Sequence, residues 1–78
     1  MIIPEKHIKL DESIIFCAAN VIPLLDKQPK VDKLFNKLCS LGVLSESELD
    51  KYYLSLDLLY ACNQIDLTTS GRIYRASN

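Results

Sequence analysis

The stretch Ile14–Leu25 contains only one strongly polar residue, Asn20, in twelve positions. Wound as a helix at about 100° per residue, it places apolar side chains on more than one side. One side carries Ile14, Ala18, Val21 and Leu25, the next carries Ile15, Ala19 and Ile22, and Phe16 lies almost opposite Ile14. A short chain can hardly bury all of these side chains in its own core. The stretch therefore predicts a small globular domain with an exposed apolar surface.

Length and composition indicate one soluble domain over residues 1–78. With 49% hydrophobic and 24% charged residues, the chain is too apolar for disorder. Its longest apolar run is shorter than the roughly 20 residues of a membrane span. The formal net charge of −1 provides no global field to attract nucleic acid or anionic lipid. No secretion signal is recognisable, so we expect a cytoplasmic protein without membrane contact.

The three cysteines, Cys17, Cys39 and Cys62, are widely spaced and embedded in apolar helical patterns. This pattern predicts buried thiols in a reducing cytosol. A metal site would need clustered ligands such as C-x-x-C, and the single histidine, His7, has no suitably spaced partner. We therefore expect neither a metal nor a cofactor.

The first half of the chain predicts an extended arm followed by two helices. Polar and apolar residues alternate over His7–Leu10, which indicates a short N-terminal strand. A helix is expected over 12–26, and Pro23 either kinks or ends it because proline lacks a backbone donor. A second helix is expected from about residue 31, with Asp32 as N-cap and Gly42 as its left-handed end. Its apolar residues at helical spacing are Leu34, Phe35, Leu38 and Leu41, and its exposed face carries Lys33, Asn36 and Lys37.

A third helix is expected to begin near residue 45 and to end near Cys62. Ser45 with Glu48 matches a capping box, and the pair Ser47 and Asp50 fits almost as well. Apolar residues recur at three- and four-residue steps, and we expect this set to face the core: Leu49, Tyr52, Tyr53, Leu56, Leu59 and Tyr60. A second apolar side of the same helix carries Leu54, Leu58 and Ala61. The third helix thus repeats the apolar surplus of the first.

The C-terminal part predicts a β-hairpin. Asn63 stands where a helix end takes a left-handed residue. Alternating residues over 65–68 and 72–75 flank a turn that contains Gly71. We expect the hairpin to pack on the helices through Ile65, Leu67 and Ile73. A short strand, three helices and a terminal hairpin are the order of a winged helix-turn-helix, a mainly α fold with a C-terminal wing.

Duplex DNA binding is the first function to weigh for such a fold. The third helix would occupy the recognition position, yet it carries Glu46, Glu48, Asp50 and Asp57 against the single cation Lys51. The resulting charge of −3 would repel phosphates. Basic residues on the second helix and the wing, among them Arg72 and Arg75, could still touch a DNA backbone. A winged-helix DNA-binding regulator is therefore the alternative function.

Enzymatic activity is not expected from this inventory. Catalysis needs a nucleophile, or an acid and a base, held by an orienting partner, and the chain offers one histidine and scattered carboxylates. A glycine-rich phosphate loop is absent, because the only glycines are Gly42 and Gly71.

A protein-interaction module fits the apolar surplus best. The candidate partner-binding residues are Ile15, Phe16, Ala19 and Ile22 on the first helix, with Leu54 and Leu58 on the third. The opposite side of the first helix, with Ile14, Ala18, Val21 and Leu25, is then expected to face the domain's own helices. Small residues such as Cys17 also let helices pack closely, so the core could absorb more apolar surface than this division implies. We expect a protein partner, or a homo-oligomer, rather than a free monomer.

Two segments carry a resemblance to a known family. The first is residues 3–13, Ile-Pro-Glu-Lys-His-Ile-Lys-Leu-Asp-Glu-Ser. The second is residues 54–61, Leu-Ser-Leu-Asp-Leu-Leu-Tyr-Ala, and this second segment leads into Asn63-Gln64-Ile65. The chain resembles, over nearly its whole length, the small middle components of prokaryotic ABC three-component systems. Asn63 stands where the family pattern prefers glycine. The resemblance implies a non-enzymatic adaptor between an ABC-type (SMC-like) ATPase and an effector, in systems associated with conflict and anti-phage defence.

Overall fold

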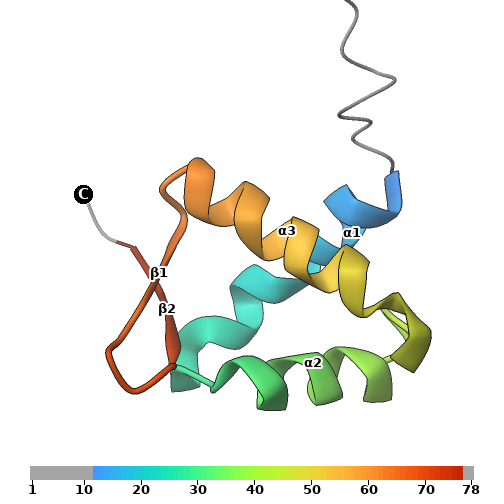
Figure 1. Ribbon diagram of the computed structural model, residues 1–78, viewed down its shortest axis with the longest axis horizontal. Coiled ribbons are helices and arrows are strands. Elements are labelled where there is room, and N and C mark those ends of the chain that lie inside the picture. The colour runs from blue at the N-terminus through green and yellow to red at the C-terminus, as the bar shows by residue number, and fades with distance from the viewer. Residues whose placement is uncertain (1–11, 77–78) are drawn as a thin grey trace, which may run out of the picture.

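The computed structural model describes residues 12–76, and the strand predicted at His7–Leu10 lies outside the described residues. Helices precede a small antiparallel hairpin in the chain (Figure 1). The α-helices are α1 (Glu12–Val21), α2 (Val31–Ser40) and α3 (Leu49–Ala61), the 3-10 helices are η2 (Ile22–Lys27) and η3 (Glu46–Glu48), and the strands are β1 (Ile65–Leu67) and β2 (Ile73–Arg75). The predicted mainly α fold with a hairpin is confirmed.

Pro23 ends the first α-helix and does not kink it. α1 stops at Val21, and the chain continues as the 3-10 helix η2, with the proline in its first turn. Proline has no N–H to donate to the carbonyl four residues before it, so the α-helical ladder cannot continue. The end of η2 is closed by Gln28, which has a φ of 49° and donates its N–H to the Leu25 carbonyl at 2.9 Å.

The expected N-cap of α2 was wrong by two positions. The cap is Lys30, in an extended conformation, and Asp32 lies inside the first turn, where its carboxylate accepts from the Lys33 N–H at 2.9 Å. Lys30 is extended because it forms a β-bridge with Arg72 of the hairpin, so the helix starts immediately after this bridge.

The two helix ends predicted from left-handed residues are confirmed. Gly42 has a φ of 79°, and Val43 donates its N–H to the Leu38 carbonyl at 3.0 Å. Asn63 has a φ of 60°, and Gln64 donates to the Leu59 carbonyl at 2.8 Å. Both are six-to-one bonds of the Schellman type, which satisfy carbonyls that the helix leaves unpaired.

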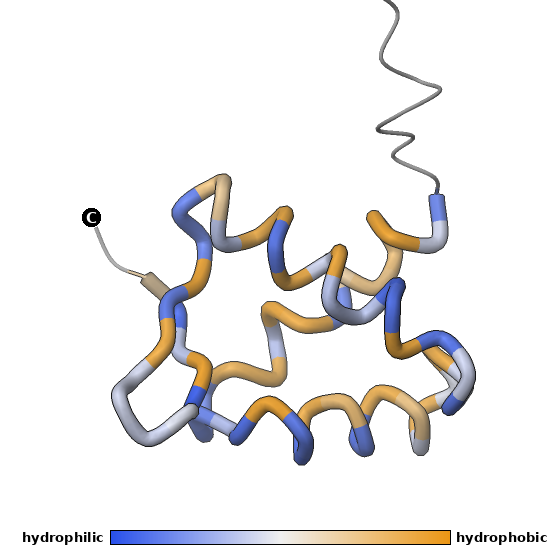
Figure 2. The backbone as a smooth tube through the Cα atoms, in the orientation of Figure 1, coloured by the Kyte–Doolittle hydropathy of each residue, from blue (hydrophilic) through white to orange (hydrophobic). Residues whose placement is uncertain are grey.

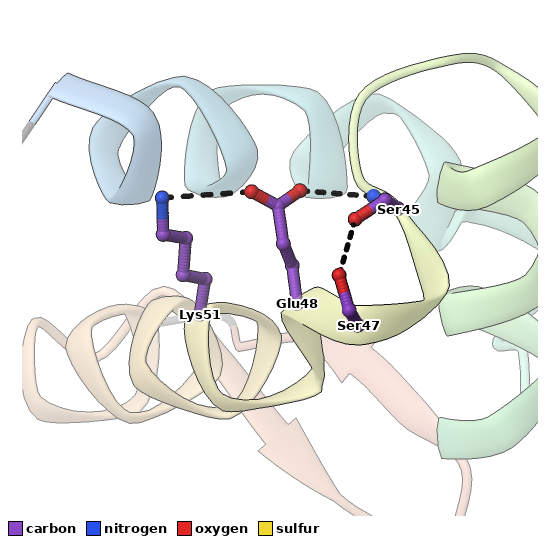
Figure 3. A network of polar contacts seen from close by, with 4 residues as sticks. All are labelled: Ser45, Ser47, Glu48 and Lys51. Carbon is purple, nitrogen blue, oxygen red and sulfur yellow. Dashed lines mark hydrogen bonds and ion pairs between the residues drawn. The ribbon is translucent and has the colours of Figure 1, made fainter.

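The predicted capping box forms at the 3-10 helix η3, which leads into α3 (Figure 3). The Glu48 carboxylate accepts from the Ser45 N–H at 2.9 Å and pairs with the Lys51 ammonium at 3.5 Å. The backbone hydrogen bond to Ser45 is the main cause that lowers the pKa of Glu48. The alternative box with Ser47 is not formed, and the Ser47 hydroxyl lies 3.0 Å from the Ser45 hydroxyl.

The hairpin is fastened to the start of α2 and to η2. Ile73 pairs with Leu67 across the hairpin and donates its N–H to the Pro29 carbonyl at 2.9 Å. The guanidinium of Arg72 donates to the Gln28 carbonyl at 3.0 Å, and that of Arg75 to the Ile22 carbonyl at 3.2 Å. Figure 1 shows the hairpin beside these segments. A two-stranded hairpin is marginal alone, and these bonds attach it to the helices.

The core is formed where α1 packs on α3, with contributions from α2 and the hairpin. Its buried apolar residues are Ile14, Cys17, Ala18, Val21, Leu25, Leu34, Leu38, Leu44, Tyr52, Leu59, Ile65 and Ile73. A buried polar chain crosses it. The Tyr52 hydroxyl donates to the Val31 carbonyl at 2.6 Å, and Ser55 Oγ donates to the Tyr52 carbonyl at 2.7 Å. Ser55 has then used its only proton, so the Cys17 thiol, 3.2 Å away, is the donor of that pair.

Several residues that were expected to be buried are instead exposed. They are Leu49, Tyr53 and Tyr60 of α3 and Leu67 of the hairpin. Where α3 packs on α1, the small residue Ser55 is fully buried against Cys17. Leu49, Tyr53 and Tyr60 lie on exposed sides of α3. Cys62 is also exposed and Cys39 partly buried, whereas buried thiols were expected at both positions. Cys62 lies after the last turn of α3, beyond the core.

Candidate protein-binding surfaces

The two sides of α1 differ in exposure in the way the sequence predicted. Cys17 and Val21 are fully buried, whereas Ile15 is 49% and Phe16 56% exposed. The expected inner residues Ile14, Ala18, Val21 and Leu25 are all buried. Of the candidate partner-binding residues, Ile15, Phe16, Ala19 and Leu54 are exposed.

The other two candidate residues take part in the domain's own packing. Ile22 and Leu58 are partly buried and pack against the core. Ile22 is the first residue of the 3-10 helix η2. Leu58 packs against the core from α3, whereas Leu54 on the same helix is 49% exposed. These two positions are therefore less available to a partner than the exposed four.

Ile15, Phe16 and Ala19 line one shallow, almost wholly apolar depression, which we call the α1 surface. Glu12 and Ser13 complete its edge. The side-chain amide of Asn20 donates to the Phe16 carbonyl of its own helix at 2.8 Å. Leu54 is exposed on α3 and does not line this depression. The structure thus brings together three of the six predicted residues.

A second apolar surface, between α3 and the hairpin, was missed by the sequence prediction. Tyr53, Tyr60 and Leu67 were expected in the core, but they line a groove of about 170 Å³, and Tyr60 is 59% exposed. The remaining lining residues are Val31, Leu56, Asp57, Ile65 and Ile73. The tyrosines Tyr53 and Tyr60 were a signal for this surface in the sequence, because tyrosine is suited both to the edge of a core and to an interface.

Charge is distributed unevenly over the exposed surface. α3 and the η3 turn before it carry the exposed acids Glu46, Asp50 and Asp57. On α2, the lysines Lys33 and Lys37 are exposed, as is the acid Asp32. Figure 2 shows hydrophilic segments in blue along the outer edge of this helix. The two arginines of the hairpin, Arg72 and Arg75, are bonded to backbone carbonyls of the domain itself.

Within residues 12–76 no cluster of three His, Cys, Asp or Glu could hold a metal ion, and no buried side-chain nitrogen or oxygen lacks a hydrogen-bond partner. Burial raises the pKa values of the Cys17 thiol and the Tyr52 hydroxyl, so both stay protonated near neutral pH. His7 lies outside the described residues. In the same range, none of the helices has the length and apolar character needed to cross a membrane.

Comparison with known proteins identifies a family. The family model described as ABC-three component (ABC-3C) system Middle Component 6 matches residues 3–76 of the chain. No curated protein and no solved structure gave a significant match.

Proposed function

The chain belongs to the ABC-3C system Middle Component 6 family, and on this premise we propose that it is a non-enzymatic adaptor. In this proposal it joins an ABC-type (SMC-like) ATPase to an effector in a prokaryotic conflict or anti-phage defence system. The α1 surface is the docking site for one of these proteins. The helices and hairpin together act as a winged-helix-like scaffold that presents this surface.

The exposure of Ile15 and Phe16 is the observation that carries the proposal. Two large apolar side chains stand next to each other on one helix, each about half exposed. Burying the rest of such a side chain would contribute about 1 kcal/mol for each. An apolar depression at this place favours a protein contact over a small-molecule site, because it is shallow and lacks convergent polar groups.

A DNA-binding regulator has less support. The acids on and before α3 would oppose a duplex at the recognition position. The two hairpin arginines that could contact phosphates already bind the Gln28 and Ile22 carbonyls. A winged-helix-like arrangement is compatible with protein binding, because fold does not dictate function.

The proposal is tested by co-expressing the chain with the products of its neighbouring genes and asking whether an ABC-type ATPase or an effector is among those that bind it. We expect affinity-tagged wild-type chain to co-purify with at least one of them. Phe16→Asp should reduce the recovered partner at least about tenfold, because a charge would enter the apolar contact. The matched control is Leu41→Asp, which changes a leucine that is 53% exposed at the end of α2.

Thermal unfolding of each purified variant separates binding from folding. Phe16→Asp is expected to melt near the wild-type temperature, since the side chain is more than half exposed. If Phe16→Asp unfolds the chain, Phe16 belongs to the core and the α1 surface is not a docking site. If the wild-type chain recovers neither neighbour, the adaptor proposal fails.

A further inference from the structure

A groove of about 350 Å³ lies between η2 and α2, away from the α1 surface. Apolar lining comes from Leu24, Pro29 and Leu34, and the charged lining from Asp26, Lys27, Lys33 and Lys37. Lys33 and Lys37 are four residues apart on α2, so their side chains project from the same side of the helix. Leu24 and Lys27 are contributed to the lining by η2.

The lysines of this groove have no acidic partner among the described residues. The one acid in the lining, Asp26, pairs with Arg75 of the hairpin at 3.7 Å. Lys27, Lys33 and Lys37 are all exposed and form no ion pair within residues 12–76. The lining therefore has a net charge of +2, on a chain whose formal net charge is −1.

We propose that this lysine groove docks an acidic segment of a partner protein, with an apolar side chain of that segment inserted between the lysines. Carboxylates of the segment would pair with the three ammonium groups, and its apolar side chain would contact Leu24 and Pro29, which are partly exposed in the lining. This interaction goes beyond the α1 surface, because it supplies a second, electrostatically distinct contact on another part of the domain.

Nucleic acid fits the same groove less well. A phosphate backbone needs cations but gains nothing from an apolar lining. A long polyanion would also meet the exposed acids of η3 and α3, whereas a short acidic segment meets only the local charge. The nearby arginines, Arg72 and Arg75, are engaged with carbonyls of the domain.

An unbiased selection of peptides tests the proposal. A display library of random peptides of about twelve residues is selected on the immobilised full chain and, in parallel, on the double variant Lys33→Gln/Lys37→Gln. The matched control is Lys30→Gln/Lys51→Gln, which removes the same charge from lysines outside the groove. Peptides selected by the wild type are expected to combine several acids with at least one large apolar residue.

Fluorescence anisotropy then measures binding of the selected peptide and of a duplex DNA of about 20 base pairs. The groove variant is expected to weaken the peptide about five- to tenfold, and the control less than about twofold. Phe16→Asp should leave this affinity unchanged, so that a failure here is distinguishable from a failure of the α1 surface.

Three outcomes would overturn the proposal. The first is a selection without acidic enrichment, and the second is equal loss in the groove and control variants. The third is duplex DNA that binds more tightly than the peptide with a dependence on Lys33 and Lys37, which would assign the groove to nucleic acid. Thermal unfolding confirms that each variant compared is folded.

Discussion

α1 and α2 are both helices of ten residues, but only α2 separates apolar from polar side chains. α2 buries Leu34 and Leu38 and exposes Lys33 and Lys37, and Figure 2 shows blue segments along its outer edge. α1 buries Cys17 and Val21 on one side and exposes Ile15, Phe16 and Ala19 on the other. The core therefore does not need the outer side of α1, and that side is available for another contact.

The largest expected effect is on the buried side of α2. Leu38→Ala should lower the free energy of unfolding by about 3 kcal/mol, because it removes a fully buried side chain and leaves a cavity. Leu41→Ala, three residues later on an exposed side chain, should change it by less than about 0.5 kcal/mol. Urea unfolding followed by circular dichroism measures both. If the two variants lost equal free energy of unfolding, α2 would not have one buried and one exposed side.

The next effect concerns the contact that joins α3 to the first turn of α2. Tyr52→Phe should cost about 1 to 2 kcal/mol, since the Val31 carbonyl loses the hydroxyl that donates to it at 2.6 Å. Tyr53→Phe is the matched control, because its side chain is about half exposed. The same unfolding experiment applies, and a neutral Tyr52→Phe would show that the hydroxyl does not hold the start of α2.

Alkaline pH should destabilise the inner side of α1. Burial raises the pKa of Cys17 above its ordinary value of 9.0, so the unfolded chain loses this proton at lower pH than the folded chain. The contribution of Cys17 is therefore complete below pH 9 and is lost as the pH rises further. Between pH 8 and pH 10 we therefore expect the free energy of unfolding to decrease.

Cysteine variants identify the source of this pH dependence. Cys17→Ala should lose most of it, whereas Cys62→Ala, at an exposed thiol, should keep it. Unfolding by urea at a series of pH values gives the comparison. An alkaline loss that is identical in the two variants would assign the effect to other groups.

The smallest expected effect is on the outer side of α1. Ile15→Lys makes this helix resemble α2, and we expect the free energy of unfolding to change by less than about 0.5 kcal/mol, because lysine suits an exposed helical position. Fluorescence of a dye that binds exposed apolar surface should decrease in the same variant. A loss above about 2 kcal/mol would mean that Ile15 packs in the core and that the two helices do not differ in this way.

Helix ends were predictable from short stretches of sequence. Glu48, Gly42 and Asn63 act through backbone groups within a few residues of themselves, so their roles do not depend on distant parts of the chain. Asp32 was mispredicted because the competing constraint is distant: the bridge between Lys30 and Arg72 sets where α2 begins.

The candidate surfaces were predictable only in part. On α1, the spacing of apolar residues separated the buried side from the side with Ile15 and Phe16. On α3 the same reasoning placed Tyr53 and Tyr60 in the core, although the position that faces Cys17 is the polar Ser55. A hydroxyl can be buried at such a contact when its hydrogen bonds are satisfied. The spacing of apolar residues does not predict the burial of a polar residue such as Ser55.

Local chemistry in the sequence was enough to locate the helices, the capping box at Ser45, the left-handed ends at Gly42 and Asn63 and the hairpin, because each depends on backbone geometry within a few residues. Tertiary packing decided which apolar residues are buried, because the burial of a side chain depends on which other helices and strands pack against it. The lysine groove arises in the same way. Lys33 and Lys37 are visible as a basic edge in the sequence, but they become a groove only where η2 packs beside α2.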